Sequence, residues 1–273
     1  MKRSCLIVLV LGCSVLLYGH STALAQLSSF AVLAGSTVTN TNTPTIVSGN
    51  LGVSPGSAVT GFPPGVVING TIHAADAVAA QAQTDLTTTY NNLANTACNT
   101  DLTGQDLGGK TLTPGVYCFS TSAQLTGTLN LDAQGNPNAL FVFKIGSTLT
   151  TASASTVNLN NGGSICGVFW QVGSSATLGT GTRLLGSIVA LTSITLNTGA
   201  SVSGRVLARN GAVTLDDSHV TVCSGGPAGS GGPIFPPFSA AIPTLSEWGI
   251  LVLTGLLILL GLAAIRAPRR RTT

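Results

Sequence analysis

The sequence predicts a mainly β protein, a triangular β-helix (a solenoid of stacked coils) with one long α-helix packed alongside and an irregular cap. The first observation behind this prediction is a spacing of 18 to 19 residues between similar short strands, as between Ile194-Thr195-Leu196 and Val213-Thr214-Leu215. The second is that the chain from Gly115 onward repeats such strands without a helical pattern. The third is that helical periodicity is confined to residues 73–97. Short internal periods of this kind are typical of solenoids.

The N-terminal residues 1–25 read as a secretory signal peptide. Lys2 and Arg3 precede an apolar run from Leu6 to Tyr18, and the small-x-small sequence Ala23-Leu24-Ala25 follows it. This order of charge, apolar run and cleavage site is that of an exported chain. We therefore expect the mature domain to span residues 26–223.

The C-terminal end has three parts that differ in composition. Residues 224–241 are rich in Gly, Pro and Ser, as in a linker. Residues 242–273 begin with Ile242-Pro243-Thr244-Leu245 and continue through an apolar stretch, 248–265, to an arginine cluster. That stretch is a candidate transmembrane segment, and the arginines predict a cytoplasmic C-terminus. The layout resembles the IPTL type of bacterial C-terminal sorting signal, which implies that a membrane-embedded processing enzyme recognises and removes the tail; a plain C-terminal anchor is the alternative.

Charge and cysteine content exclude several classes of function. Only 7% of residues are charged, and no basic stripe is present, so we expect no nucleic-acid partner. Four cysteines remain after the signal peptide: Cys98, Cys118, Cys166 and Cys223. In an exported chain they favour two disulfides, for which three pairings exist; we favour Cys98 with Cys118 and Cys166 with Cys223. Their spacing does not resemble a zinc site, and we expect no metal, no cofactor and no catalytic residues.

Between the first coil and the later ones lie two segments of different character. Residues 42–70 are dense in Gly and Pro and predict the irregular cap. Residues 73–97 carry the apolar stripe Val78, Ala82, Leu86, Tyr90 and Leu93, whereas Gln81, Asp85, Thr88, Asn91 and Asn92 lie opposite. We expect this helix to lie along one face of the solenoid, since it has nothing else to pack on.

The coils can be aligned on their inward apolar residue. The alignment places Val38, Leu125, Leu149, Leu178, Leu196 and Leu215 in one column. Because side chains alternate along a strand, the preceding residues form an outward column: Thr37, Gln124, Thr148, Thr177, Thr195 and Thr214. Neighbouring outward positions add Thr39, Thr126, Thr150, Ser175, Ser193 and Asn197. All of these positions except Gln124 form the predicted binding face.

A flat, regular and almost uncharged grid of methyls and hydroxyls suits a partner that is itself a lattice. Threonine is stiff at χ1, so the grid is ordered before it binds. Methyls can sit in cages of ordered water while hydroxyls bond into the water layer, and the candidate lattice is ice. Threonine also has high β propensity, so the same ladder occurs in solenoids that bind nothing through it.

Several segments resemble the widespread microbial ice-binding protein family. They include LSSFAVLAGSTVTNT, GNLGVSPGSAVTGFPPG, LTPGVYCF, FVFKIGSTLTT and ALTSITLNTGASVSGRVLARNGAVTLD, and the similarity covers about Leu27 to Cys223. The resemblance implies a discontinuous right-handed β-helix with a flanking α-helix, and adsorption to ice through one flat face. Some members carry Thr-Ala/Gly-x-Thr/Asn motifs, which suggests an alternative ice face at Thr180, Thr182, Thr198 and Ser201. We prefer the first face, because Arg183 and His219 flank the second.

Two other classes of function remain open. One is a cell-surface adhesin or structural β-helix without ice activity. The other is a polysaccharide-active β-helix enzyme, for which Asp216, Asp217, Arg209 and His219 form the one cluster to test; adjacent strand residues point to opposite faces, which favours a solvated corner turn there. We expect a monomeric ice-binding protein, exported and then held at the cell envelope or surface, or secreted after removal of the tail.

Overall fold

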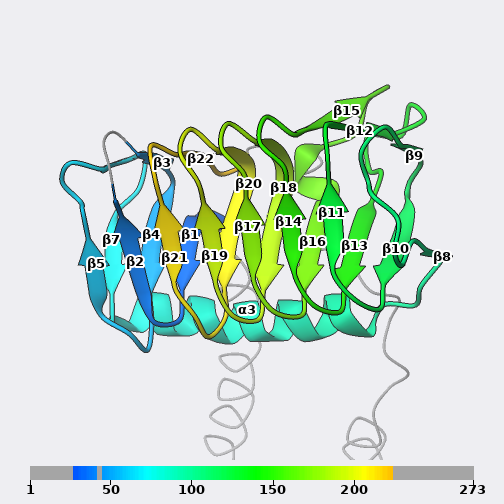
Figure 1. Ribbon diagram of the computed structural model, residues 1–273. Helices are drawn as coiled ribbons and strands as arrows, with labels where there is room; N and C mark the ends of the chain where they lie inside the picture. Colours follow the sequence, from blue (N-terminus) through cyan, green and yellow to red (C-terminus); the bar gives the residue numbers. More distant parts are fainter. Residues whose placement is uncertain (1–26, 42–44, 224–273) are drawn as a thin grey trace, which may run out of the picture. The chain divides into compact units, whose positions relative to one another are not determined.

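The computed structural model describes residues 27–41 and 45–223, which form a β-helix with one helix along its side (Figure 1). The predicted signal peptide, the linker and the sorting signal, with its candidate span 248–265 and Ile242 to Leu245, lie outside these residues. In the described part of the chain, no helix combines the length and the apolar character needed to cross a membrane. The predicted β-helix with a flanking helix is confirmed.

Three faces are built from successive strands of each coil. The helix face contains β1 (Phe30–Ala34), β4 (Asn50–Val53), β7 (Ile72–Ala74), β8 (Thr100–Asp101), β10 (Gly115–Phe119), β13 (Phe141–Ile145) and β16 (Val168–Val172). The threonine face contains β2 (Thr37–Asn40), β5 (Ala58–Thr60), β11 (Ala123–Leu125), β14 (Leu149–Thr151), β17 (Ala176–Leu178), β19 (Ile194–Leu196) and β21 (Val213–Leu215). The third face contains β3 (Ile46–Ser48), β6 (Val66–Ile68), β9 (Thr111–Leu112), β12 (Thr128–Asp132), β15 (Thr156–Asn160) and β22 (His219–Thr221).

Two long strands, β18 (Arg183–Ala190) and β20 (Ser201–Ala208), start on the third face and continue around the corner onto the helix face. Gly186 and Gly204 lie at this corner with φ of 99° and 152°, a range that side chains disfavour. A Cβ on Gly204 would lie 1.9 Å from the carbonyl oxygen of Gly186. Glycine is therefore needed where the two rungs stack at the bend.

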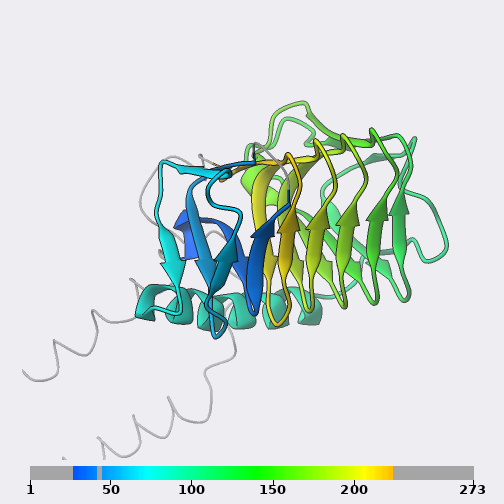
Figure 2. The same cartoon turned by 60° about the vertical axis from the view of Figure 1, so that its left-hand side comes forward.

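The coils are stacked out of sequence order. On the threonine face the order is β11-β14-β17-β19-β21-β2-β5, so the last coil of the chain pairs with the first. Val38 pairs with Val213 on this face, Val32 with Val206 on the helix face, and the third face pairs Val220 with Val47. The two views show the early, blue coils continuing the yellow ones (Figures 1 and 2). The first coil of the chain thus stacks directly on the last one.

The predicted irregular cap over residues 42–70 is wrong. Apart from residues 42–44, which are outside the described residues, the segment forms β3, which completes the first coil, and β4, β5 and β6, which form a further regular coil. Equivalent positions are 21 residues apart, and Asn50 bonds across this spacing to both Ser29 and Thr71. The Gly and Pro residues that suggested irregularity mostly occupy the corners between these short strands.

The helix α3 spans Ala77–Asn95 and begins at the cap residue Asp76, whose Oδ1 accepts a hydrogen bond of 2.8 Å from the Ala79 amide. The expected start at residue 73 is corrected, because Ile72–Ala74 form β7. The predicted stripe is confirmed: Ala82, Leu86, Tyr90 and Leu93 are buried against outward side chains of the helix face. These are Leu27, Phe30, Leu33, Val116, Val142, Phe169, Val189 and Leu207.

One residue placed on the solvent side of the helix is buried instead. Asp85 is only 7% exposed, and its Oδ1 accepts a hydrogen bond of 2.9 Å from Gln81 Nε2. Its Oδ2 has no hydrogen-bond partner among the described residues. Burial raises the pKa of this carboxyl above its usual value.

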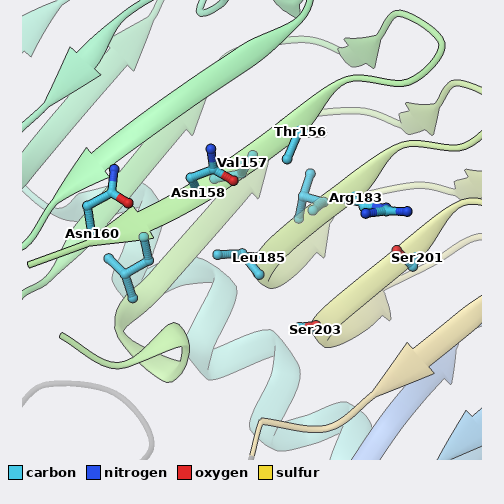
Figure 3. A pocket seen from close by; sticks show the side chains of 10 residues that line it. Thr156, Val157, Asn158, Asn160, Arg183, Leu185, Ser201 and Ser203 are labelled. Atoms are coloured by element: carbon cyan, nitrogen blue, oxygen red, sulfur yellow. The ribbon is translucent and has the colours of Figure 1, made fainter. Parts of the chain in front are cut away.

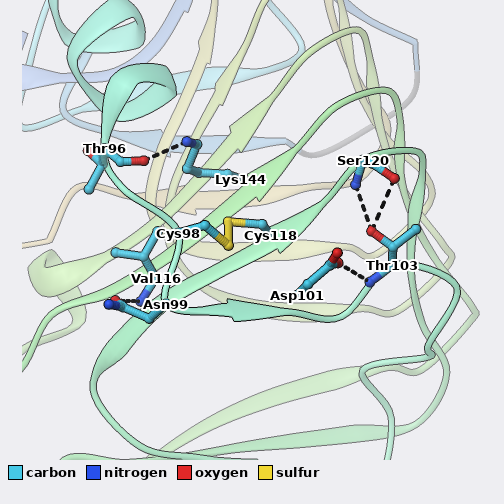
Figure 4. Close-up of a disulfide and its surroundings, with 9 residues drawn as sticks. All are labelled: Thr96, Cys98, Asn99, Asp101, Thr103, Val116, Cys118, Ser120 and Lys144. Carbon is cyan, nitrogen blue, oxygen red and sulfur yellow. Dashed lines mark hydrogen bonds between the residues drawn. A yellow bond between two sulfur atoms is a disulfide. The ribbon is translucent and has the colours of Figure 1, made fainter.

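Both favoured disulfides are present, Cys98–Cys118 and Cys166–Cys223. The first ties the segment after α3 to β10, and beside it Lys144 Nζ donates 2.5 Å to the carbonyl of Thr96 at the end of the helix (Figure 4). The second ties the end of the last coil to the short 3-10 helix η1 (Ile165–Gly167). Each disulfide therefore restrains a place where the regular coil pattern starts or stops.

Candidate functional site

A single outward row of threonines runs along the threonine face. Strand register aligns, in stacking order, Gln124, Thr150, Thr177, Thr195, Thr214, Thr39 and Thr60. Neighbouring strands in a sheet are about 4.7–4.9 Å apart, so the row spans about 29 Å over seven strands. Six of its seven positions are threonine, which makes the row a near-perfect repeat.

The residues on either side of each row position hold the face flat. At every rung except that of Thr60 they point inward and are buried, as Ala176 and Leu178 are around Thr177, and Ile194 and Leu196 around Thr195. Close packing of the core beneath these rungs leaves their strands little freedom to move. The χ1 preference of threonine then orders the methyl and hydroxyl groups above it.

The hydroxyls of the row are largely available to an external partner. Thr60 Oγ1 donates 3.2 Å to Thr39 Oγ1. Within residues 27–41 and 45–223, the hydroxyls of Thr150, Thr177, Thr195 and Thr214 have no hydrogen-bond partner. No strand of this face carries a charged residue. The surface therefore offers a water lattice both methyls and unpaired hydroxyls.

The expected register is wrong in two coils, by two residues in each. Thr39 pairs with Thr214, and Thr150 with Thr177, so these two residues take the central positions expected for Thr37 and Thr148. The cause is a buried polar residue in each coil. Thr151 lies inward beside Leu178 and Leu125, and Asn40 lies inward beside Leu215. An alignment on apolar residues therefore selects Leu149 and Val38, two residues too early in each strand.

These two inward residues are held by hydrogen bonds. Thr151 Oγ1 lies 2.8 Å from Thr182 Oγ1 and accepts 2.9 Å from the Gly179 amide. Asn40 Nδ2 donates 3.1 Å to the Gly61 carbonyl. Such bonds offset the cost of burying a polar group. The hydrogen bonds allow a polar residue at an inward position where the alignment predicts an apolar one.

The other predicted positions flank the central row. Thr37 and Thr148 lie two residues before it, level with Ser175 and Ser193; Thr126 and Asn197 lie two residues after it. Several hydroxyls on the earlier side link rungs: Ser193 Oγ accepts 3.2 Å from the Ala212 amide, and Thr148 Oγ1 donates 2.8 Å to Ser122. These flanking hydroxyls contribute to order within the face.

The alternative face does not form a continuous surface. Thr182 is fully buried and bonds to Thr151, so it cannot meet a partner. Ser201 lies on the third face, paired with Arg183 on one side and His219 on the other. Thr180 and Thr198 are exposed near the corner between the faces. The prediction that these four residues form a single face is therefore wrong.

Thr60 is absent from the predicted binding face, because the Gly and Pro content of its segment predicts a cap. The signal is in the chain: Ala58-Val59-Thr60 lies 21 residues after Thr37-Val38-Thr39, and the two triplets pair residue by residue. It adds a rung at the end of the row opposite Gln124.

The acidic pair Asp216 and Asp217 lies in a corner turn. Asp217 has φ of 48°, and the Asp216 amide donates 3.2 Å to Ser218 Oγ. Asp216 Oδ2 accepts a hydrogen bond of 2.5 Å from Thr198 Oγ1. Across the described ranges, no group of three or more His, Cys, Asp or Glu side chains could hold a metal ion. The pair thus belongs to the bend between the threonine face and the third face.

The fold and this face define a class: a β-helix protein with a flat, uncharged, threonine-bearing sheet and a helix on another side. Residues 32–221 match the model of the Ice-binding-like family, and the chain belongs to that family. Residues 240–271 match the IPTL-CTERM motif, that of a C-terminal sorting signal.

Relatives support the same membership. An ice-binding protein of Nostoc sp. (strain HG1) is 62% identical over 199 residues, covering 72% of this chain and 73% of that protein. The crystal structure of an ice binding protein from an Antarctic biological consortium superimposes with a TM-score of 0.70 at 46% identity, covering 73% of this chain and 90% of that one. That of an ice-binding protein from the ascomycete Antarctomyces psychrotrophicus has a TM-score of 0.70 at 38% identity, with coverage of 74% and 98%.

Proposed function

We propose that this protein adsorbs to ice through the threonine face and so inhibits ice growth and recrystallisation. The observation that carries the proposal is the outward row of six threonines in register along one seven-stranded sheet. Family membership supports it, since the relatives compared above are themselves ice-binding proteins and none is a β-helix enzyme.

The face suits ice for a physical reason. A charged side chain holds its own hydration shell, which differs from the order of ice, and the strands of the face carry no such side chain. The row's methyls can order water around them, and its unpaired hydroxyls can bond into that layer. Many such contacts act together, and because the groups are already ordered, little entropy is lost on adsorption.

The ice-binding residues of this proposal are those of the corrected rows. The central row supplies Thr39, Thr60, Thr150, Thr177, Thr195 and Thr214. The flanking positions supply Thr37, Thr126, Thr148, Ser175, Ser193 and Asn197. An ice recrystallisation assay on residues 26–223, at micromolar concentration and with the fold checked by circular dichroism, tests the proposal. We expect small grains to persist; grain coarsening equal to that of a buffer control would refute it.

For the tail, we propose that a membrane-embedded enzyme recognises Ile242, Pro243, Thr244 and Leu245 and removes the residues that follow. The IPTL-CTERM match supports this proposal. The exported product, held at the cell surface or released, then keeps the β-helix domain outside the cell. Mass spectrometry of the exported protein should show loss of the tail, and Pro243→Ala should leave the tail attached. An unprocessed wild-type product would contradict the proposal.

A further inference from the structure

The third face contains a groove that the ice-binding proposal does not use. The strand β15 pairs with β12 over all five of its residues, but it pairs with β18 only through Thr156 and Arg183. Beyond that pair the two strands separate. The resulting cavity of about 460 Å³ lies between β15 and the first halves of β18 and β20 (Figure 3). This volume is within the usual range of about 300–1,000 Å³ for small-molecule sites.

The lining combines hydrogen-bonding groups with four apolar side chains. Asn158 and Asn160 lie along β15, Leu185 and Arg183 on β18 across the gap, and Ser201 and Ser203 on β20 beyond (Figure 3). Leu159 and Leu185, both half-buried, supply apolar surface. Amides and hydroxyls around apolar patches are the groups that would bond a sugar's hydroxyls and contact the apolar side of its ring.

Among the residues that line the groove, Arg183 is the charged one, so the groove carries positive charge. Arg183 is exposed, and its guanidinium makes no hydrogen bond or ion pair within the described residues. Among the described residues, no carboxylate lines the cavity. The acidic side chain on the neighbouring strand β12, Asp132, lies level with Asn160 and accepts a hydrogen bond of 2.9 Å from Asn161 Nδ2. The free guanidinium is therefore available to bind a carboxylate with two parallel hydrogen bonds.

We propose that this groove binds an acidic polysaccharide, a glycan chain that carries uronate carboxylates. The carboxylate would pair with Arg183, and the sugar hydroxyls with Asn158, Asn160, Ser201 and Ser203. An extended peptide would need open backbone groups at the strand edges. One such group is taken, because Trp170 Nε1 donates 2.9 Å to the carbonyl of Leu185. The lining therefore favours recognition by side chains over strand addition.

The groove and the threonine face are built from different strands of the coil, so a glycan and an ice surface do not compete for the same side chains. A protein adsorbed to ice could then hold a matrix polysaccharide at the same time. Glycan binding does not depend on the ice-binding proposal, since it takes place in liquid solution. Failure of one would leave the other standing.

Affinity electrophoresis of the full-length chain, kept in solution with a non-ionic detergent, tests the proposal. Gels contain polygalacturonate, neutral dextran or polyglutamate. We expect retardation by polygalacturonate and not by dextran, with affinity reduced roughly tenfold by Arg183→Gln, which removes the charge-assisted bonds. Ser203→Trp, which fills the groove, should abolish retardation with an unchanged circular dichroism spectrum.

Lys110→Gln is the matched control, because it removes the same charge from a residue that does not line the groove and whose Nζ bonds to Gln105 Oε1 at 2.8 Å. It should keep wild-type affinity. The proposal is overturned by an absence of retardation in polygalacturonate, by equal affinities of the Arg183→Gln and Lys110→Gln proteins, or by retardation in polyglutamate as strong as in the glycan.

Discussion

Thr195→Tyr should remove most of the ice activity, because Thr195 is the middle position of the row. Its neighbours Thr177 and Thr214 are each about 4.8 Å away across the sheet. A tyrosine ring standing above this plane would hold ice away from all three positions. Of the row of about 29 Å, only the two outermost positions at each end would then remain for contact, each pair about 4.8 Å apart. If adsorption requires the whole flat surface, thermal hysteresis should fall by at least about half, as expected when the centre of an interface is disrupted.

The same substitution should leave the fold intact. Tyrosine has high β propensity, and substitutions at exposed positions usually change stability by no more than about 0.5 kcal/mol. Hysteresis should be measured by nanolitre osmometry, with circular dichroism and thermal melting as checks. Thr221→Tyr is the matched control, since Thr221 is exposed on the third face. Wild-type hysteresis in Thr195→Tyr, or equal loss in Thr221→Tyr, would show that the wrong face has been chosen.

Three further changes test other parts of the structure. Gln124→Thr should raise hysteresis slightly, because it adds a seventh threonine to the row; a decrease would argue against the row as the contact surface. The double change Cys166→Ala with Cys223→Ala, which opens a 57-residue loop, should lower the free energy of unfolding by roughly 4 kcal/mol in denaturant titrations, and a loss below about 1 kcal/mol would contradict this. Asp85→Asn should raise the melting temperature at pH 7, because burial raises the carboxyl's pKa and its ionised form opposes folding; the gain should vanish below the unfolded pKa of 3.8, and an equal gain at pH 3.5 would refute that cause.

Much of the architecture could be predicted from local patterns. Alternating apolar residues with an 18-residue to 19-residue spacing identify the coils, and the stripe from Ala82 to Leu93 identifies the helix. These signals are local, because the side chains that face one core must recur at the period of the strand or helix. Where composition replaced periodicity, as in residues 42–70, the prediction failed, since Gly and Pro mark corners as well as irregular loops.

The register of the face depended on contacts that local patterns do not contain. The alignment on apolar residues puts Leu149 and Val38 in the column that Thr151 and Asn40 occupy. Both polar residues are buried, and their partners Thr182 and Gly61 lie 31 and 21 residues away. The helical pattern likewise predicts Asp85 on the solvent side, yet this residue is buried. In each case a distant group supplies the hydrogen bonds or the cover that makes burial of a polar side chain possible.

By itself, then, the sequence determined the coil period, the outward threonines of the later coils, the helix and its apolar stripe, because each follows from which side chains must avoid water. Only the tertiary structure decided that the first coil follows the last, since this pairing of Val38 with Val213 joins residues 175 positions apart. That junction brings Thr39 beside Thr214, with Thr60 next to Thr39, and joins the two ends of the domain in one row. Its physical cause is the open edge of β21, whose backbone groups are satisfied when β2 pairs with it.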